Sequence, residues 1–179
     1  MRIVGITGVL TTSPHSAMWM HLQQSFARHF PRSSFFVEHL FYLPWEIYKM
    51  RSFANYIVDK YDDGEDELLL LGYSMGGVLA RNVAGSLRKT RVNTIVTIFS
   101  PHMLWGSWFS TMLGAPQYDS VPLLSFQARN DCVVWWGSRP RHSSSHYVID
   151  SSHYLSLLQP HVAEKIAHIV AKNHRKDRS

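Results

Sequence analysis

The sequence predicts an α/β fold, a three-layer sandwich in which helices cover a mostly parallel sheet of about six strands. Short apolar runs alternate with stretches of helical periodicity along the 179 residues, which is typical of strand-helix-strand units. The four leucines at 68–71 are too few for a helix and suit a strand buried on both faces. The length fits a single domain, 1–179, and 45% hydrophobic against 17% charged residues excludes a disordered chain.

Local patterns place the individual elements. Strands are expected where apolar and β-branched residues run together, at residues 2–7, 34–40, 68–71, 92–99, 121–127 and 147–149. Helices are expected where apolar residues recur every three or four positions, at residues 15–29, 45–60 and 75–88 and from Pro160 onward. A ligand site in such a sheet lies beyond the carboxyl ends of its strands, so the residues that follow each strand are the candidates.

Charge and composition argue against several classes of protein. The net charge is +5, but the basic residues are scattered and no nucleic-acid-binding motif accompanies them, so we expect no nucleic-acid partner. The single cysteine, Cys132, excludes an internal disulfide, and the eleven histidines show no metal-ligand spacing, so no metal is expected. Residues 1–8 begin like a dinucleotide-binding unit but lack the glycines of G-x-G-x-x-G.

The first residues also bear on localisation. Residues 1–8 carry one positive charge and a brief apolar stretch without a cleavage motif, which predicts a strand and not a signal peptide. No window approaches the roughly 18 uninterrupted apolar residues that a membrane span needs. We therefore expect a cytoplasmic protein without stable membrane insertion.

The segment Gly72-Tyr73-Ser74-Met75-Gly76 fits the pattern G-x-S-x-G. It follows the expected buried strand and precedes an expected helix, which is the context in which a sharp turn lifts a serine hydroxyl above the sheet. The helix also points its first backbone N–H groups at the same place. Ser74 is therefore the candidate nucleophile.

A serine nucleophile needs a histidine base and a carboxylate that orients the histidine. Asp131 follows the strand expected at 121–127, and His153 follows the last expected strand, so both lie at the carboxyl edge. Asp150, three residues before His153, is the second choice for the acid. His102 also follows a strand, but it precedes every good acid in the chain, and we assign it to the lining of the substrate pocket.

Gly8, the segment 72–76, Asp131 and His153 together resemble the α/β-hydrolase superfamily, particularly its smallest lipases and esterases, which lack a large cap. The resemblance spans nearly the whole chain. It implies an oxyanion hole made by the backbone N–H groups of Met75 and Val9, with Leu10 as an alternative donor. The sequence departs from the family at this loop, because the common His-Gly pair is Thr7-Gly8 here and the glycine-rich stretch that usually follows is Val9-Leu10-Thr11-Thr12.

The resemblance implies a serine hydrolase that cleaves carboxylic esters or thioesters of short to medium acyl chains without a cofactor. Its substrate would be a small-molecule acyl ester. Residues 103–118 include Trp105 and Trp108 and are expected to form either a short lid and acyl-binding wall or a helix packed into the core. A non-catalytic binding protein that retains the hydrolase fold is the alternative.

Overall fold

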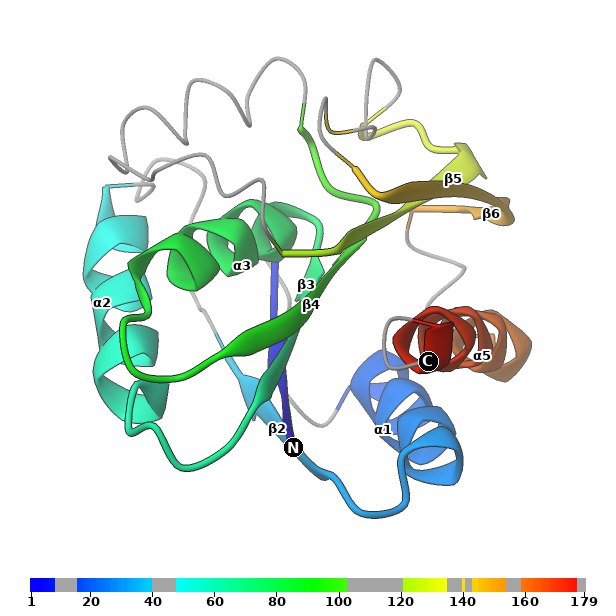
Figure 1. The fold of residues 1–179 in the computed structure, drawn as a ribbon. Coiled ribbons are helices and arrows are strands. Elements are labelled where there is room, and N and C mark those ends of the chain that lie inside the picture. Colours follow the sequence, from blue (N-terminus) through cyan, green and yellow to red (C-terminus); the bar gives the residue numbers. More distant parts are fainter. Residues whose placement is uncertain are drawn as a thin grey trace.

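The computed structural model describes residues 1–8, 16–39, 48–102, 121–134, 140, 143–153 and 159–176. Within these ranges there are six strands and four helices, which alternate as far as the fourth strand; two further strands and a last helix follow (Figure 1). The strands are β1 (Arg2–Ile6), β2 (Ser34–Glu38), β3 (Leu68–Tyr73), β4 (Val92–Ile98), β5 (Leu123–Asn130) and β6 (Ser145–Ser152). The helices are α1 (Ala17–His29), α2 (Lys49–Tyr61), α3 (Met75–Ser86) and α5 (Pro160–Lys176).

All six strands form one parallel sheet in the order β2-β1-β3-β4-β5-β6. The chain passes from β1 to β2 on one side and then crosses back to place β3 on the other side of β1. From β3 onward each strand is added next to the one before it. The carboxyl ends of β1 and β3 therefore lie where the winding changes direction, which is where open α/β sheets bind their ligands.

The sheet divides the core into two apolar layers. Alternate residues of β3 point to opposite faces, so Leu69 and Leu71 pack with α1 and α5 while Leu68 and Leu70 pack with α2 and α3. Figure 1 shows the same division, with α1 and α5 side by side on one face and α2 and α3 on the other. Every residue of β3 is buried, as the leucine run predicts.

The prediction of a three-layer α/β fold is confirmed, and each expected strand and helix is present. The largest difference lies in the last two strands. β5 continues to Asn130 instead of ending at residue 127, and β6 spans Ser145–Ser152 instead of 147–149. The expected lid at 103–118 lies outside the described residues, and the single domain stays a prediction.

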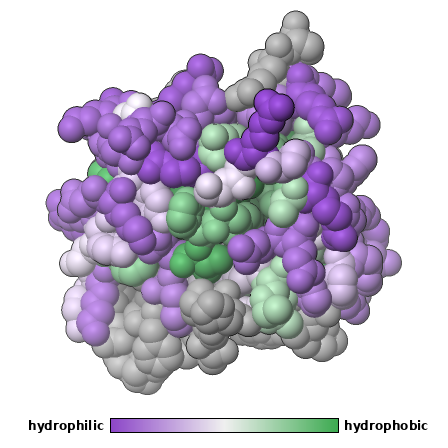
Figure 2. Space-filling model, turned by 90° about the horizontal axis from the view of Figure 1, so that it is seen from below, coloured by the Kyte–Doolittle hydropathy of each residue, from purple (hydrophilic) through white to green (hydrophobic). Residues whose placement is uncertain are grey.

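Polar side chains dominate much of the surface. The face seen in Figure 2 carries a central cluster of hydrophobic residues surrounded by hydrophilic residues.

Within the described ranges, no helix combines the length and the apolar character that crossing a bilayer requires.

Candidate active site

Ser74 occupies the sharp turn between the end of β3 and the start of α3. Its backbone has φ 51° and ψ −126°, a conformation that non-glycine residues rarely adopt. The turn is held by two backbone hydrogen bonds. The Ser74 N–H donates to the Ile98 carbonyl at 2.8 Å, and the Gly77 N–H donates to the Ser74 carbonyl at 3.0 Å. Such strain is typical of functional turns that the surrounding structure fixes in place.

Two glycines make this turn sterically feasible. A Cβ on Gly72 would lie 2.3 Å from the Gly76 carbonyl oxygen, and a Cβ on Gly76 would lie 2.2 Å from the Ile6 carbonyl oxygen. Both distances are shorter than any carbon–oxygen contact in a relaxed structure, so the backbones of β1, β3 and α3 approach closely only because these side chains are absent. The glycines of the G-x-S-x-G pattern thus have a packing reason.

The end of β1 lies directly beside the candidate nucleophile. A Cβ built on Gly8 would come within 3.5 Å of the Ser74 Oγ. The backbone that leaves β1 therefore runs next to the Ser74 hydroxyl, at the change of winding between β1 and β3. Val9 and Leu10, expected to supply an oxyanion N–H, follow immediately and lie outside the described residues.

Asp131 and His153 are joined by a buried hydrogen bond. The His153 Nδ1 lies 2.9 Å from the Asp131 Oδ2, and the two side chains are 2% and 1% exposed. Asp131 follows β5 directly and His153 follows β6 directly, so the pairing of these two strands brings the side chains together. The structure thus unites two residues that are 22 positions apart in the sequence.

The remaining carboxylate oxygen of Asp131 is also satisfied. Asp131 Oδ1 accepts the backbone N–H groups of Val133 at 2.9 Å and Val134 at 2.7 Å. Burial alone would raise the pKa of Asp131, but the hydrogen bonds from His153 and from these two N–H groups outweigh it and hold the pKa below its ordinary value. A carboxylate can only accept hydrogen bonds, so the neutral His153 carries its proton on Nδ1.

Two aromatic residues that the sequence analysis did not identify as part of a site lie beside the His153 ring. The ring of Tyr73, one residue before Ser74, lies 5.4 Å from the His153 ring, and the Tyr73 hydroxyl donates to the His153 carbonyl at 3.0 Å. The Phe99 ring lies 6.1 Å from the His153 ring. Tyr73 occupies the first variable position of G-x-S-x-G, which is a usable signal, whereas nothing in the local sequence marks Phe99.

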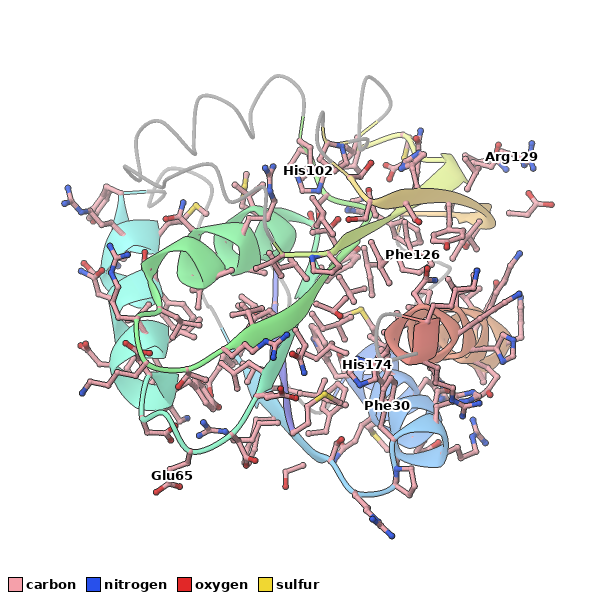
Figure 3. The ribbon with its side chains drawn as sticks, viewed as in Figure 1. Phe30, Glu65, His102, Phe126, Arg129 and His174 are labelled. Atoms are coloured by element: carbon pink, nitrogen blue, oxygen red, sulfur yellow. The ribbon has the colours of Figure 1, made fainter. Side chains whose placement is uncertain are left out.

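The other candidates have different surroundings. Asp150, the second choice for the acid, lies on β6 with its side chain 79% exposed and forms an ion pair with Arg129 at 3.4 Å. Figure 3 shows Arg129 near the carboxyl end of β5, projecting away from the sheet. The hydrogen bond to His153 is therefore made by Asp131, and Asp150 lies at the surface.

His102 is buried beyond the end of β4 (Figure 3). Its Nε2 lies 3.0 Å from the Thr97 hydroxyl, while its Nδ1 has no hydrogen-bond partner within the described part of the chain. Burial, together with the nearby charges of Arg81 and His146, lowers the pKa of His102 to about 3. His102 is thus a neutral side chain at the carboxyl edge, and its assignment to the substrate pocket stays a prediction.

Trp105 and Trp108, the other residues expected to contact substrate, lie outside the described residues. Met75, the expected oxyanion donor after Ser74, is the first residue of α3. Among the described side chains, His, Cys, Asp and Glu form no group of three that could hold a metal ion.

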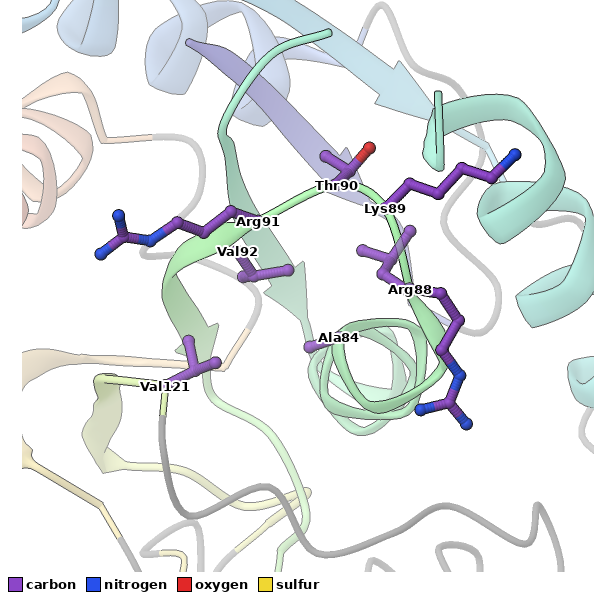
Figure 4. Close-up of a pocket in the computed structure, with 8 residues that line it drawn as sticks. Ala84, Arg88, Lys89, Thr90, Arg91, Val92 and Val121 are labelled. Atoms are coloured by element: carbon purple, nitrogen blue, oxygen red, sulfur yellow. The ribbon is translucent and has the colours of Figure 1, made fainter. Parts of the chain in front are cut away.

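A separate cavity lies beside the carboxyl end of α3 (Figure 4). It has a volume of about 350 Å³ and lies between the last turn of α3 and the amino end of β4. Its lining combines an apolar floor with the side chains of Arg88, Lys89 and Arg91. Because Ser74 lies at the opposite end of α3, this cavity is not the space around the candidate nucleophile.

Comparisons with known proteins agree with this architecture. A family model described as the PGAP1-like alpha/beta domain matches residues 42–112, a stretch that contains the turn at Ser74. No curated protein matches the chain in sequence.

Several solved structures share the fold. A chain of the metagenome-derived lipolytic enzymes LipS and LipT superposes with a TM-score of 0.67 at 17% identity, covering 98% of this chain and 93% of that one. The pyrethroid hydrolase PytH gives 0.68 at 14% identity, covering 99% of both chains. The esterase domain of a Rhodothermus marinus protein gives 0.60 at 15% identity, covering 98% and 86%. The fold is that of the α/β hydrolases, as the resemblance implies.

Proposed function

We propose that the protein is a serine hydrolase that cleaves carboxylic esters or thioesters, with Ser74 as nucleophile, His153 as base and Asp131 as the orienting acid. The observation that carries the proposal is the buried hydrogen bond between Asp131 and His153, made at the same sheet edge as the strained turn of Ser74. The likeness of the fold to structures named as lipolytic and esterase proteins supports it.

The first half of the reaction acylates Ser74. Asp131 keeps the proton of His153 on Nδ1, so Nε2 is the nitrogen that accepts the proton of the Ser74 hydroxyl as Oγ attacks the substrate carbonyl. The resulting imidazolium is stabilised by the Asp131 carboxylate, whose lowered pKa keeps it ionised. His153 then returns the proton to the leaving alcohol or thiol, and the acyl group stays on the Ser74 Oγ.

The second half releases the acid. A water molecule gives its proton to His153 Nε2 and attacks the acyl carbonyl, after which the proton passes back to Ser74. In both halves we assign the backbone N–H groups of Met75 and Val9 to the oxyanion. An N–H at the start of α3 suits this role because the helix dipole favours negative charge there. His153 and Asp131 are buried, so little solvent screens their interaction.

The acyl side of the substrate is assigned from the sequence. The segment 103–118 follows β4 in the sequence, and on that ground we assign Trp105 and Trp108 to the acyl-binding side of the site. We place His102, neutral and buried at the carboxyl edge, in the pocket lining. A short to medium acyl chain is the substrate that this small apolar wall suits.

A fluorophosphonate probe tests the proposal directly, because it reacts with an activated serine and leaves unactivated serines unlabelled. We expect labelling of the folded protein at Ser74, and its loss in Ser74→Ala together with a decrease in kcat for p-nitrophenyl butyrate on the order of 10⁶. Ser86→Ala is the matched control, since Ser86 ends the helix that Ser74 precedes and its hydroxyl donates to the Asn82 carbonyl.

The same experiment separates the enzyme from a non-catalytic binding protein with the hydrolase fold. That alternative is motivated by the sequence from Val9 to Thr12, which departs from the glycine-rich stretch that the family has in its oxyanion loop. A folded wild-type protein that the probe does not label and that does not hydrolyse the ester would support the binding protein. Labelling that persists in Ser74→Ala would place the nucleophile elsewhere.

A further inference from the structure

Two aromatic rings, those of Tyr73 and Phe99, pack against the ring of the proposed base His153. The rings of Tyr73 and Phe99 lie 5.4 Å and 6.1 Å from the His153 ring, and they contact each other edge-to-face at 6.4 Å. Tyr73 is 3% exposed and Phe99 is completely buried. The imidazole is therefore packed against two fixed rings and is not free to rotate into solvent.

Phe99 adopts an unusual backbone conformation to reach this position. Its φ is +50°, in the left-handed region that bulky residues avoid. Its N–H donates to the Phe126 carbonyl at 2.8 Å, which fixes the peptide that carries the strain. A glycine would adopt this φ without strain. The backbone conformation at position 99 therefore favours glycine, and the chain has an aromatic residue there despite that preference.

Tyr73 connects the proposed base to the proposed nucleophile. Its hydroxyl donates to the His153 carbonyl at 3.0 Å, and its backbone is joined to Ser74 by a peptide bond. A shift of the Tyr73 side chain would therefore change the position of His153 relative to Ser74. The hydrogen bond is buried, so water is a poor substitute for it.

We propose that Tyr73 and Phe99 are positioning residues that hold His153 in register with both Asp131 and Ser74, an inference that rests on the proposed serine hydrolase function. The Asp131 carboxylate fixes one edge of the imidazole, the two rings fix its plane, and the Tyr73 hydroxyl fixes its backbone. Each constraint acts on a different degree of freedom, and together they define the direction of Nε2.

The contribution of the hydroxyl is tested by Tyr73→Phe, which keeps the ring and removes one oxygen. We expect kcat for p-nitrophenyl butyrate to fall by about tenfold to a hundredfold with KM nearly unchanged, because misplacing a catalytic group by about 1 Å has an effect of this size. Tyr147→Phe is the matched control, since the Tyr147 hydroxyl accepts a hydrogen bond from Asn173 away from His153. Equal kcat values in Tyr73→Phe and Tyr147→Phe would overturn the role of the hydroxyl.

The role of the Phe99 ring is tested by two variants that differ in backbone strain. Phe99→Ala removes the ring and keeps a Cβ at φ +50°, whereas Phe99→Gly removes the ring and also relieves the strain. We expect the glycine variant to be the more stable of the two, while both lose kcat by a similar factor. Recovery of the wild-type kcat in Phe99→Gly would show that the ring has no positioning role.

A matched control separates positioning from general core damage. Phe126 is also completely buried and stacks on Tyr147, so Phe126→Leu should lower thermal stability without a specific loss of kcat per folded molecule. Phe99→Leu makes the same change at position 99 and is the variant to compare. A loss of kcat in Phe126→Leu as large as in Phe99→Leu would contradict the assignment of Phe99.

An NMR measurement makes failure of this inference distinguishable from failure of the proposed function. We expect the His153 Nδ1 proton, which is hydrogen-bonded to Asp131, to resonate at low field and to exchange with water faster in Tyr73→Phe and Phe99→Ala than in Tyr147→Phe. Faster exchange in a protein that the fluorophosphonate probe does not label would support the positioning role of Tyr73 and Phe99 and refute the proposed hydrolase function. Unchanged exchange in a protein that the probe labels would refute the positioning role alone.

Discussion

Gly8 and Ser74 are in such close contact that no side chain fits between them. A Cβ on Gly8 would lie 2.8 Å from the Ser74 Cβ and 2.9 Å from the Tyr73 carbonyl oxygen. In Gly8→Ala one of the two backbones must therefore move, and we expect kcat for p-nitrophenyl butyrate to fall by about a hundredfold. Steady-state kinetics of the purified variant checks this.

Gly5→Ala provides the control for the Gly8 experiment. A Cβ at Gly5, on β1 three residues before Gly8, would meet the Trp19 ring at 2.6 Å, in the core and away from Ser74. We expect this variant to be destabilised by about 1–3 kcal/mol through overpacking, with a near-normal kcat per folded molecule. A Gly8→Ala enzyme that retains full kcat would show that the backbone after β1 does not constrain the nucleophile.

Substituting the two candidate acids is expected to have unequal effects. Asp131→Asn replaces the acceptor of the His153 Nδ1 proton by an amide that can stabilise the wrong imidazole tautomer, and a loss of kcat on the order of 10⁴ is expected. Asp150→Asn removes an exposed ion pair with Arg129, whose contribution to stability is below about 1 kcal/mol. We expect its kcat to stay close to that of the wild type, and the reverse order would transfer the role to Asp150.

His102 is expected to make the fold sensitive to acid. Its pKa falls from the ordinary 6.5 to about 3 in the folded protein because of burial and the positive charges of Arg81 and His146. Below pH 6.5 the unfolded chain binds a proton that the folded chain does not, so the free energy of unfolding decreases as the pH falls toward 3. The decrease amounts to about 2 kcal/mol by about pH 5.

The pH effect is measured by urea unfolding at a series of pH values. His102→Asn should flatten the decrease between pH 6.5 and about pH 5. The lowered pKa of Asp131 acts only below its ordinary value of 3.8 and so does not enter this range. The same slope in wild type and His102→Asn would mean that His102 titrates normally.

Acyl-chain preference tests the assignment of Trp105 and Trp108. Each buried methylene contributes about 0.8 kcal/mol, or roughly fourfold in kcat/KM when it is held in the transition state. We expect kcat/KM to rise over the first few carbons from acetate esters and then level off. The double replacement by Ala should reduce that rise and leave acetate esters nearly unaffected. An unchanged profile up to decanoate would place the acyl pocket elsewhere.

Patterns local to the chain were sufficient to predict the elements whose burial is uniform. The four leucines of β3 predict a central strand because both faces of it are covered. β6 was predicted too short because its ends, Ser145 and Ser152, are polar and pair only through tertiary contacts with β5. The extension of β5 to Asn130 has the same cause, since residues 128 and 130 pair with β6. Propensity within one segment does not contain that information.

The candidate site was predictable to the extent that chain order and strand ends define it. Ser74 was identified by the G-x-S-x-G pattern between a strand and a helix, and Asp131 and His153 were identified because each follows a strand. The left-handed φ of Phe99 and the hydrogen bond from Tyr73 to the His153 carbonyl were not predictable. Both depend on which strands become neighbours and how closely they approach, and no local sequence pattern reports that distance.

The position of β6 at the edge of the sheet has a dynamic consequence. His153 is carried by this outermost strand, which pairs with β5 alone among the described strands, whereas Ser74 follows β3, which is paired on both sides. Edge strands open at a lower free energy than central ones, so amide hydrogens of β6 should exchange before those of β3. On warming, detachment of β6 would separate His153 from Ser74 while the central strands remain folded. Heat inactivation would then precede the loss of helical structure, and the two midpoints would report different parts of the same molecule.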